Sequence, residues 1–146
     1  MIKIIATLFF VLLLNFAHAE TLDDIATTSA DYVNACEVTY QLKMTYCRGI
    51  VVQKTTNCLR HSISLFPKKQ RKTLTDMVKK KLNDMSVKSQ ADVDKGFEKV
   101  LTDNNQDKEK ACQIYSEDLT NKRNDRYYEF RNILKVAFPN NKKPSD

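Results

Sequence analysis

Glycine, proline and tryptophan are scarce in this chain of 146 residues. It contains two glycines, Gly49 and Gly96, three prolines and no tryptophan. Because glycine and proline interrupt helices, this scarcity leaves most of the chain free to be helical. No stretch shows the sustained alternation of apolar and polar residues that is typical of half-buried strands. These absences favour an all-α protein over a fold rich in strands.

The chain also lacks the residues of common catalytic and nucleotide-binding sites. Two distant glycines exclude both a phosphate-binding P-loop and a G-x-G-x-x-G dinucleotide motif. No serine lies in a G-x-S-x-G context, and His61 is the only histidine after residue 19. Since His61 lies near a predicted helix end, we expect it to interact with the helix dipole there. We therefore expect no enzymatic activity, no cofactor and no metal site.

Residues 1–19 have the pattern of a cleaved secretory signal peptide. Lys3 supplies a positive charge, residues 4–16 form a mostly apolar run, and residues 17–19 read Ala-His-Ala, an A-x-A cleavage site. The apolar run is shorter than the roughly 20 residues of a membrane-spanning helix. We expect a mature protein that begins at Glu20, has no membrane span and is periplasmic or secreted.

Basic residues exceed acidic ones in the mature chain. The whole chain has 24 basic and 18 acidic residues, and removal of Lys3 leaves 23 basic residues and a net charge of +5. We do not expect nucleic acid as a partner, because an exported chain rarely meets any. The basic residues gather at 68–72 and 79–81. Anionic lipid, peptidoglycan or an acidic protein could bind them, but their position opposite the apolar stripe favours a solvated helix face.

All four cysteines follow the predicted signal peptide, at Cys36, Cys47, Cys58 and Cys112. An even number in an exported chain predicts two disulfides, and the long spacings differ from the close ligand pairs of zinc sites. Each of the first three cysteines lies eleven residues from the next, which is about 16 Å along one helix. The Cα atoms of a disulfide lie within about 7 Å of each other, so the chain must reverse between any two of these three that are bonded. Four cysteines allow three pairings, of which we prefer Cys36–Cys47 across a helical hairpin with Cys58–Cys112.

The apolar spacing predicts a single domain, residues 20–138, built as a small disulfide-braced bundle of about five helices. Residues 139–146 are expected to form a flexible tail. The first two predicted helices run from near Thr21 or Ser29 to about Tyr40 and from 43 to 61. The next two run from after Pro67 to about 85, and from a capping box at Ser89 and Asp92 to about 101. After a polar turn at 102–107, the last helix runs from 108 to 138 with a kink or division at 121–125, and Pro139 stops it. Gly49 lies inside the second predicted helix, where it indicates either close packing or a helix break.

The last predicted helix carries a group of aromatic and arginine residues. Tyrosine and arginine are enriched at the energetic centres of protein interfaces. About half of the aromatic side chains in this segment must pack inward, since the helix also contributes to the core. The candidate partner-binding residues are Arg123, Arg126, Tyr127, Tyr128 and Arg131.

Several features, in this order, resemble the Tai/Rap family of small exported all-helical immunity proteins. They are Cys36, then Cys47-Arg48-Gly49-Ile50-Val51, then Cys58, an amphipathic helix over residues 74–82, and a final Phe138-Pro139. The chain differs from the family pattern in having Ile50 for an aromatic residue, Asn140 for a terminal cysteine, and Cys112 earlier in the chain.

The resemblance implies that the chain protects bacteria by binding a type VI secretion peptidoglycan amidase in the periplasm and blocking its active site. Such a complex would contain one or two copies of each protein, so a homodimer is allowed. The alternative from a different class is a secreted or periplasmic helical carrier or stress chaperone for small apolar ligands or unfolded chains.

The export prediction is tested by the N-terminus of the protein recovered from the envelope or medium. We expect an intact mass that begins at Glu20, and an Ala19→Arg variant that keeps its leader because signal peptidase requires a small residue there. Recovery of the unprocessed chain from the cytoplasm, with Met1 or Ile2 at its start and all four thiols free, would contradict the prediction.

Overall fold

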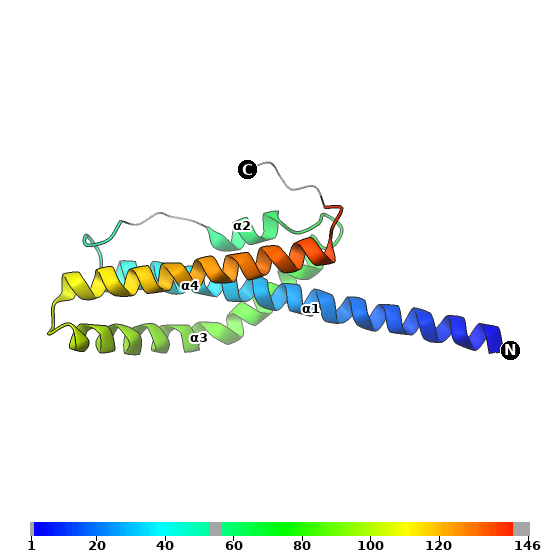
Figure 1. Cartoon of the computed structure of the whole chain (residues 1–146), viewed down its shortest axis with the longest axis horizontal. Helices are drawn as coiled ribbons and strands as arrows, with labels where there is room; N and C mark the ends of the chain where they lie inside the picture. Colours follow the sequence, from blue (N-terminus) through cyan, green and yellow to red (C-terminus); the bar gives the residue numbers. More distant parts are fainter. Residues whose placement is uncertain (1, 53–56, 142–146) are drawn as a thin grey trace.

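The computed structural model describes the backbone of residues 2–52 and 57–141, and the side chains of residues 21–52, 57–86 and 90–141. Its helices are α1 (Ile2–Thr45), α2 (Cys58–Ser64), α3 (Arg71–Asp103) and α4 (Lys108–Ala137). The three long helices lie side by side, and the N-terminal part of α1 extends beyond the others (Figure 1). The described residues contain no strand. The predicted all-α, disulfide-braced bundle is therefore confirmed.

Helix α1 is the central element, because it packs against α3, α4 and α2. Its buried residues cover more than one face and include several small side chains, which allow neighbouring helices to approach closely. They are Ile25, Ala26, Ser29, Ala30, Tyr32, Val33, Cys36, Thr39 and Leu42. The buried hydroxyls have partners: Ser29 pairs with Ser62 of α2, and Thr39 donates to the carbonyl oxygen of Ala35 at 2.7 Å. A central helix with satisfied polar groups can be covered on several sides without loss of hydrogen bonds.

The core is divided into two clusters along the bundle. The first joins the middle of α1 to α2, to the start of α3 and to the end of α4, with Phe66, Leu74 and Phe130 among its buried members. The second joins the end of α1 to the end of α3 and the start of α4, with Leu42 and Phe97 among its members. Each cluster contains one of the two disulfides.

The four cysteines form two disulfides as predicted, but the preferred pairing is wrong. The pairs are Cys36–Cys58, with Cα atoms 6.2 Å apart, and Cys47–Cys112, with Cα atoms 5.6 Å apart. The expected hairpin between Cys36 and Cys47 does not exist, because α1 continues without a break to Thr45. The chain reverses only after Cys47, and this reversal brings Cys58 back alongside Cys36.

The predicted helix over residues 43–61 is also wrong, and Gly49 shows why. Its φ of +80° lies in the left-handed region, where a side chain costs about 1 kcal/mol, and the amide of Ile50 donates to the carbonyl of Cys47 at 3.0 Å in a turn. A new helix begins at Cys58, where the Asn57 side chain accepts from the amide of Arg60. Gly49 is therefore a helix break. Residues 53–56 of the prediction lie outside the described residues.

Close packing requires glycine at Gly96 instead. A Cβ atom there would overlap the phenol ring of Tyr115, so the absence of a side chain lets α3 and α4 approach. The capping box predicted at Ser89 and Asp92 does not start a helix, because the backbone of α3 is helical throughout 71–103. The ribbon of α3 changes direction part-way along its length (Figure 1).

Helix α4 is likewise one helix, so of the kink or division predicted at 121–125 the division is absent. The polar turn predicted before α4 is confirmed, with Asn105 and Gln106 at φ of 54° and 64° and Asp107 as the N-cap. Pro139 follows the C-cap Phe138, as predicted. Residues 142–146 of the predicted tail lie outside the described residues.

Among the residues whose side chains are described, which start at residue 21, no helix is long and apolar enough to cross a bilayer.

The two disulfides should differ in their contribution to stability. Cross-linking residues 65 positions apart removes more unfolded-chain entropy than cross-linking residues 22 positions apart, about 4 against about 3 kcal/mol. We expect Cys47→Ala/Cys112→Ala to lower the free energy of unfolding more than Cys36→Ala/Cys58→Ala does, as measured by urea denaturation under oxidising conditions. Peptide mapping that recovers a Cys36–Cys47 fragment would contradict the pairing itself.

Candidate protein-binding surface

All five candidate partner-binding residues lie on α4, and we call them the Tyr–Arg surface: Arg123, Arg126, Tyr127, Tyr128 and Arg131. Arg123, Tyr127 and Arg131 recur every fourth residue, so they form one row along the helix. The row depends on α4 remaining helical through residues 121–125. A break there would have turned Arg123 away from Tyr127.

Tyr127 connects this surface to the rest of the bundle. Its half-buried ring lies 5.1 Å from the Tyr32 ring of α1 and 5.6 Å from the His61 ring of α2, centroid to centroid. Arg131 donates from Nη1 to the Tyr127 hydroxyl at 2.8 Å, and its guanidinium carbon lies 5.7 Å from the ring centroid. Packing, a hydrogen bond and a cation–π contact therefore fix Tyr127 in one orientation.

Tyr32 and His61 complete this aromatic cluster, and sequence reasoning did not connect them to it. The Tyr32 hydroxyl lies 3.3 Å from His61 Nδ1, and burial raises the pKa of Tyr32. His61 does lie in the last turn of α2, as expected from its place near a helix end. Its aromatic contacts could not be predicted, because its partners lie 29 and 66 residues away in the sequence.

Tyr128 and Arg126 face outward from the aromatic cluster. The Tyr128 side chain is 64% exposed, although its ring centroid lies 5.9 Å from that of Tyr127. Arg126 donates to both carboxylate oxygens of Glu129, at 3.2 and 2.9 Å. An exposed ion pair of this kind contributes little stability, so Arg126 can exchange Glu129 for another carboxylate. The next aromatic residue, Phe130, is buried in the core.

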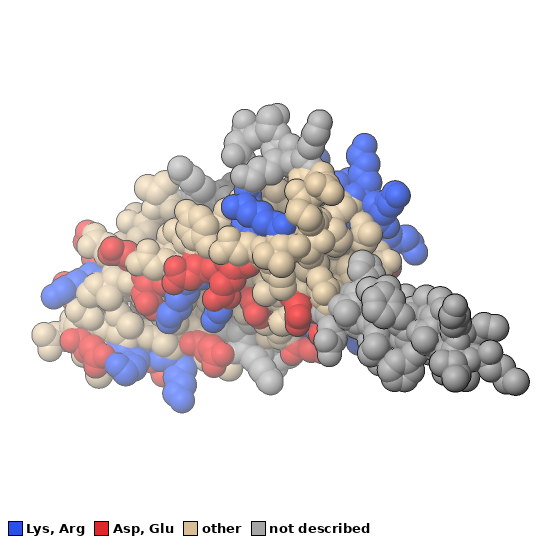
Figure 2. All heavy atoms as spheres, turned by 45° about the vertical axis from the view of Figure 1, so that its right-hand side comes forward, with Lys and Arg blue, Asp and Glu red and all other residues tan. Residues whose placement is uncertain are grey.

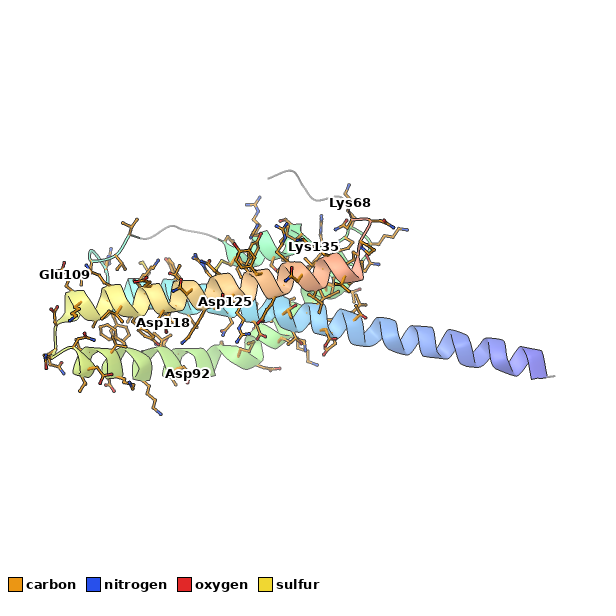
Figure 3. All side chains as sticks on the ribbon, in the orientation of Figure 1. Lys68, Asp92, Glu109, Asp118, Asp125 and Lys135 are labelled. Atoms are coloured by element: carbon orange, nitrogen blue, oxygen red, sulfur yellow. A yellow bond between two sulfur atoms is a disulfide. The ribbon has the colours of Figure 1, made fainter. Side chains whose placement is uncertain are left out.

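A charged cleft of about 570 Å³ adjoins Arg126 where α1, α3 and α4 meet. Its charged lining residues are Asp31, Asp92, Lys122 and Arg126, and Tyr115 contributes an aromatic wall. Burial raises the pKa of Asp31, and the positive charge of Arg126 opposes that effect. Figure 3 shows Asp92 on α3 and Asp118 on the stretch of α4 that runs beside it.

The basic residues at 68–72 and 79–81 are mostly solvated. Lys68, Lys69, Lys72, Lys79 and Lys80 are all exposed. The two others have partners within the chain. Arg71 donates to the carbonyl oxygen of Phe66 at 3.1 Å, and Lys81 pairs with Asp23 at 3.0 Å. Most of the positive charge in these segments is thus exposed at the surface.

The described residues hold no group of three or more His, Cys, Asp or Glu side chains that could bind a metal ion. The cysteines are all paired in the two disulfides. Comparison with protein-family models, with curated proteins and with solved structures finds no match for this chain.

The raised pKa of Asp31 in the charged cleft can be tested by the pH dependence of stability. Because its pKa is raised in the folded state, ionisation of Asp31 costs stability, and that cost appears as the pH rises through the folded-state pKa. We expect Asp31→Asn to unfold at a higher temperature than the wild type at pH 7, and the difference to vanish below the ordinary pKa of 3.8. Thermal denaturation followed by circular dichroism measures both. A difference that grows as the pH falls would contradict the expected sign.

Proposed function

We propose that this chain is an exported, non-catalytic binding protein that neutralises a secreted toxin. The partner would be a type VI secretion effector, a peptidoglycan amidase whose active site the bound protein occludes. The observation that carries the proposal is the Tyr–Arg surface, a partly exposed group of tyrosine and arginine side chains on a disulfide-braced helix.

The physical properties of the Tyr–Arg surface suit protein recognition. Tyr128 offers a large amphipathic ring with few rotatable bonds, so its immobilisation on binding costs little entropy. Tyr127 is already fixed by Tyr32, His61 and Arg131, which lowers that cost further. Arg126 already donates from Nη1 to both carboxylate oxygens of Glu129. A partner's carboxylate could take the place of Glu129 and accept two parallel hydrogen bonds from the guanidinium.

The compartment and the partner class rest on separate support. Two disulfides fit a protein of an oxidising space outside the cytoplasm. The described core residues, from Leu22 and Ile25 onward, all belong to the mature chain that cleavage after Ala19 would leave. The class of partner rests on the resemblance to the Tai/Rap family in the order of Cys36, the Cys47 to Val51 motif, Cys58 and the helix that follows.

A second function, a carrier of small apolar ligands, is favoured by a different cleft. It has a volume of about 580 Å³, within the range of small-molecule sites, and lies between α1 and the start of α2. Val33, Tyr40, Met44 and Leu59 give it apolar walls, and the Cys36–Cys58 disulfide also borders it. A carrier would use this cleft rather than the Tyr–Arg surface.

Two matched tyrosine substitutions separate the two functions. Tyr128 and Tyr40 are both exposed, at 64% and 46%, but Tyr128 belongs to the Tyr–Arg surface and Tyr40 to the apolar cleft. We expect Tyr128→Ala to weaken binding of the toxin by at least about 30-fold, the effect of losing an interface hot spot of about 2 kcal/mol, and Tyr40→Ala to leave it unchanged. Titration calorimetry with a candidate amidase, sought among the products of the neighbouring genes, measures both affinities.

Protection is measured by co-expressing the same amidase, exported to the periplasm, and recording lysis. The wild type and Tyr40→Ala should prevent lysis, and Tyr128→Ala should not. Continued lysis with correctly exported wild-type protein would reject protection against that amidase. Loss of ligand binding in Tyr40→Ala alone, with no protein partner bound, would favour the carrier.

A further inference from the structure

Charge is separated along the bundle. Segments 57–82 and 126–141 together contain eleven basic and two acidic residues, whereas segment 83–125 contains seven basic and ten acidic residues. Figure 3 shows Lys68 and Lys135 at the same end of the bundle and Glu109 at the opposite end. In Figure 2, blue side chains gather without red ones at the upper right, while both colours mix at the other end. We call the first region the basic end, represented by Lys68, Lys69, Lys72, Arg131 and Lys135.

Carboxylates near the basic end cancel only part of its charge. Asp23 forms an ion pair with Lys81 at 3.0 Å, and Glu129 forms an ion pair with Arg126 at 2.9 Å. Asp24 and Asp76 remain as exposed acidic residues in this half of the described chain. With Lys81 and Arg126 neutralised by these pairs, nine of the eleven basic residues remain, against Asp24 and Asp76.

An apolar groove opens between the basic side chains. It has a volume of about 230 Å³, with walls from Leu65, Leu134, Phe138 and Pro139, and Arg131 and Lys135 also line it. The neighbouring Val136 is 83% exposed. Exposed apolar surface bordered by lysine and arginine is the combination that peripheral membrane proteins present to a charged bilayer.

We infer that the basic end binds the surface of a bilayer that contains anionic lipids. This inference goes beyond the proposed function and does not depend on it, because the lysines that carry it lie outside the Tyr–Arg surface, with which the basic end shares only Arg131. The basic end binds phosphate headgroups through the lysines of the turn before α3 and of the last turns of α4. The apolar groove then meets the boundary between headgroups and acyl chains.

The distribution of the charges favours a membrane over a compact acidic ligand. Four of the five representative residues are lysines, which act as point charges and do not form the paired hydrogen bonds with which arginine selects a single carboxylate. They are spread over two segments rather than directed into one polar cavity, which suits the diffuse charge of a lipid surface.

Vesicle sedimentation with charge-reversed variants tests this inference. The basic-end variant is Lys68→Glu/Lys69→Glu/Lys135→Glu. The matched control, Lys95→Glu/Lys108→Glu/Lys110→Glu, reverses three lysines of the opposite half that are also exposed. It has the same net charge as the basic-end variant. Each processed protein is mixed with vesicles of phosphatidylglycerol and phosphatidylcholine in equal parts, or of phosphatidylcholine alone. Circular dichroism establishes that both variants keep the helical content of the wild type.

The wild type should bind the anionic vesicles and not the neutral ones, and raising salt from about 0.1 M to about 1 M should release it. The basic-end variant should lose at least about 100-fold in affinity, and the control less than about tenfold. Equal losses in the two variants would mean a non-specific effect of net charge and would overturn the inference. Equal binding to both vesicle types, or no binding to either, would also overturn it, as would full release of the protein by inorganic phosphate at constant ionic strength.

Discussion

The structure depends on the burial of α1 on several sides at once. A helix that contacts α2, α3 and α4 must present apolar or small side chains around most of its circumference, and Ala26, Ser29 and Ala30 meet that requirement. A bundle of three long helices is thin, so its apolar interior divides into two clusters along the axis. The Cys36–Cys58 and Cys47–Cys112 disulfides each hold one of these clusters together, which compensates for the limited depth of the core.

This arrangement explains why α4 can present a rigid Tyr–Arg surface. Phe130 and Leu134 anchor the helix in the first cluster, and Cys112 anchors its start in the second. Tyr127 lies between these anchors, and its half-buried ring packs against the rings of Tyr32 and His61. The exposed ring of Tyr128 lies beside that of Tyr127. A partner would meet a surface whose side chains are largely ordered before binding, and such preorganisation favours tight association.

The same helix leads from the Tyr–Arg surface to the basic end. Arg131 belongs to both, since it donates to Tyr127 and also lines the apolar groove with Lys135. The two surfaces nevertheless differ in chemistry. Ring packing and directed hydrogen bonds dominate around Tyr127, whereas solvated lysines and unpaired charge dominate around Lys68. Binding of a protein partner would therefore depend on the shape of the Tyr–Arg surface, whereas binding of an anionic surface would depend on the charge of the basic end.

The amino-acid sequence by itself determined the helical class, the polar turn before α4, the stop at Pro139 and the disulfide bonding of all four cysteines, because each follows from local composition or from the count of a residue type. It also identified the residues of the Tyr–Arg surface. It did not predict that three of them form one row along α4, or which residues of other helices they contact. Only the tertiary structure decided which cysteines pair and which aromatic rings meet. The pairing depended on where α1 ends. The sequence left open whether Gly49 lies inside a helix or in a turn that breaks it, and the structure shows the turn. The union of Tyr32, His61 and Tyr127 required three helices to pack, and packing depends on contacts between residues far apart in the chain.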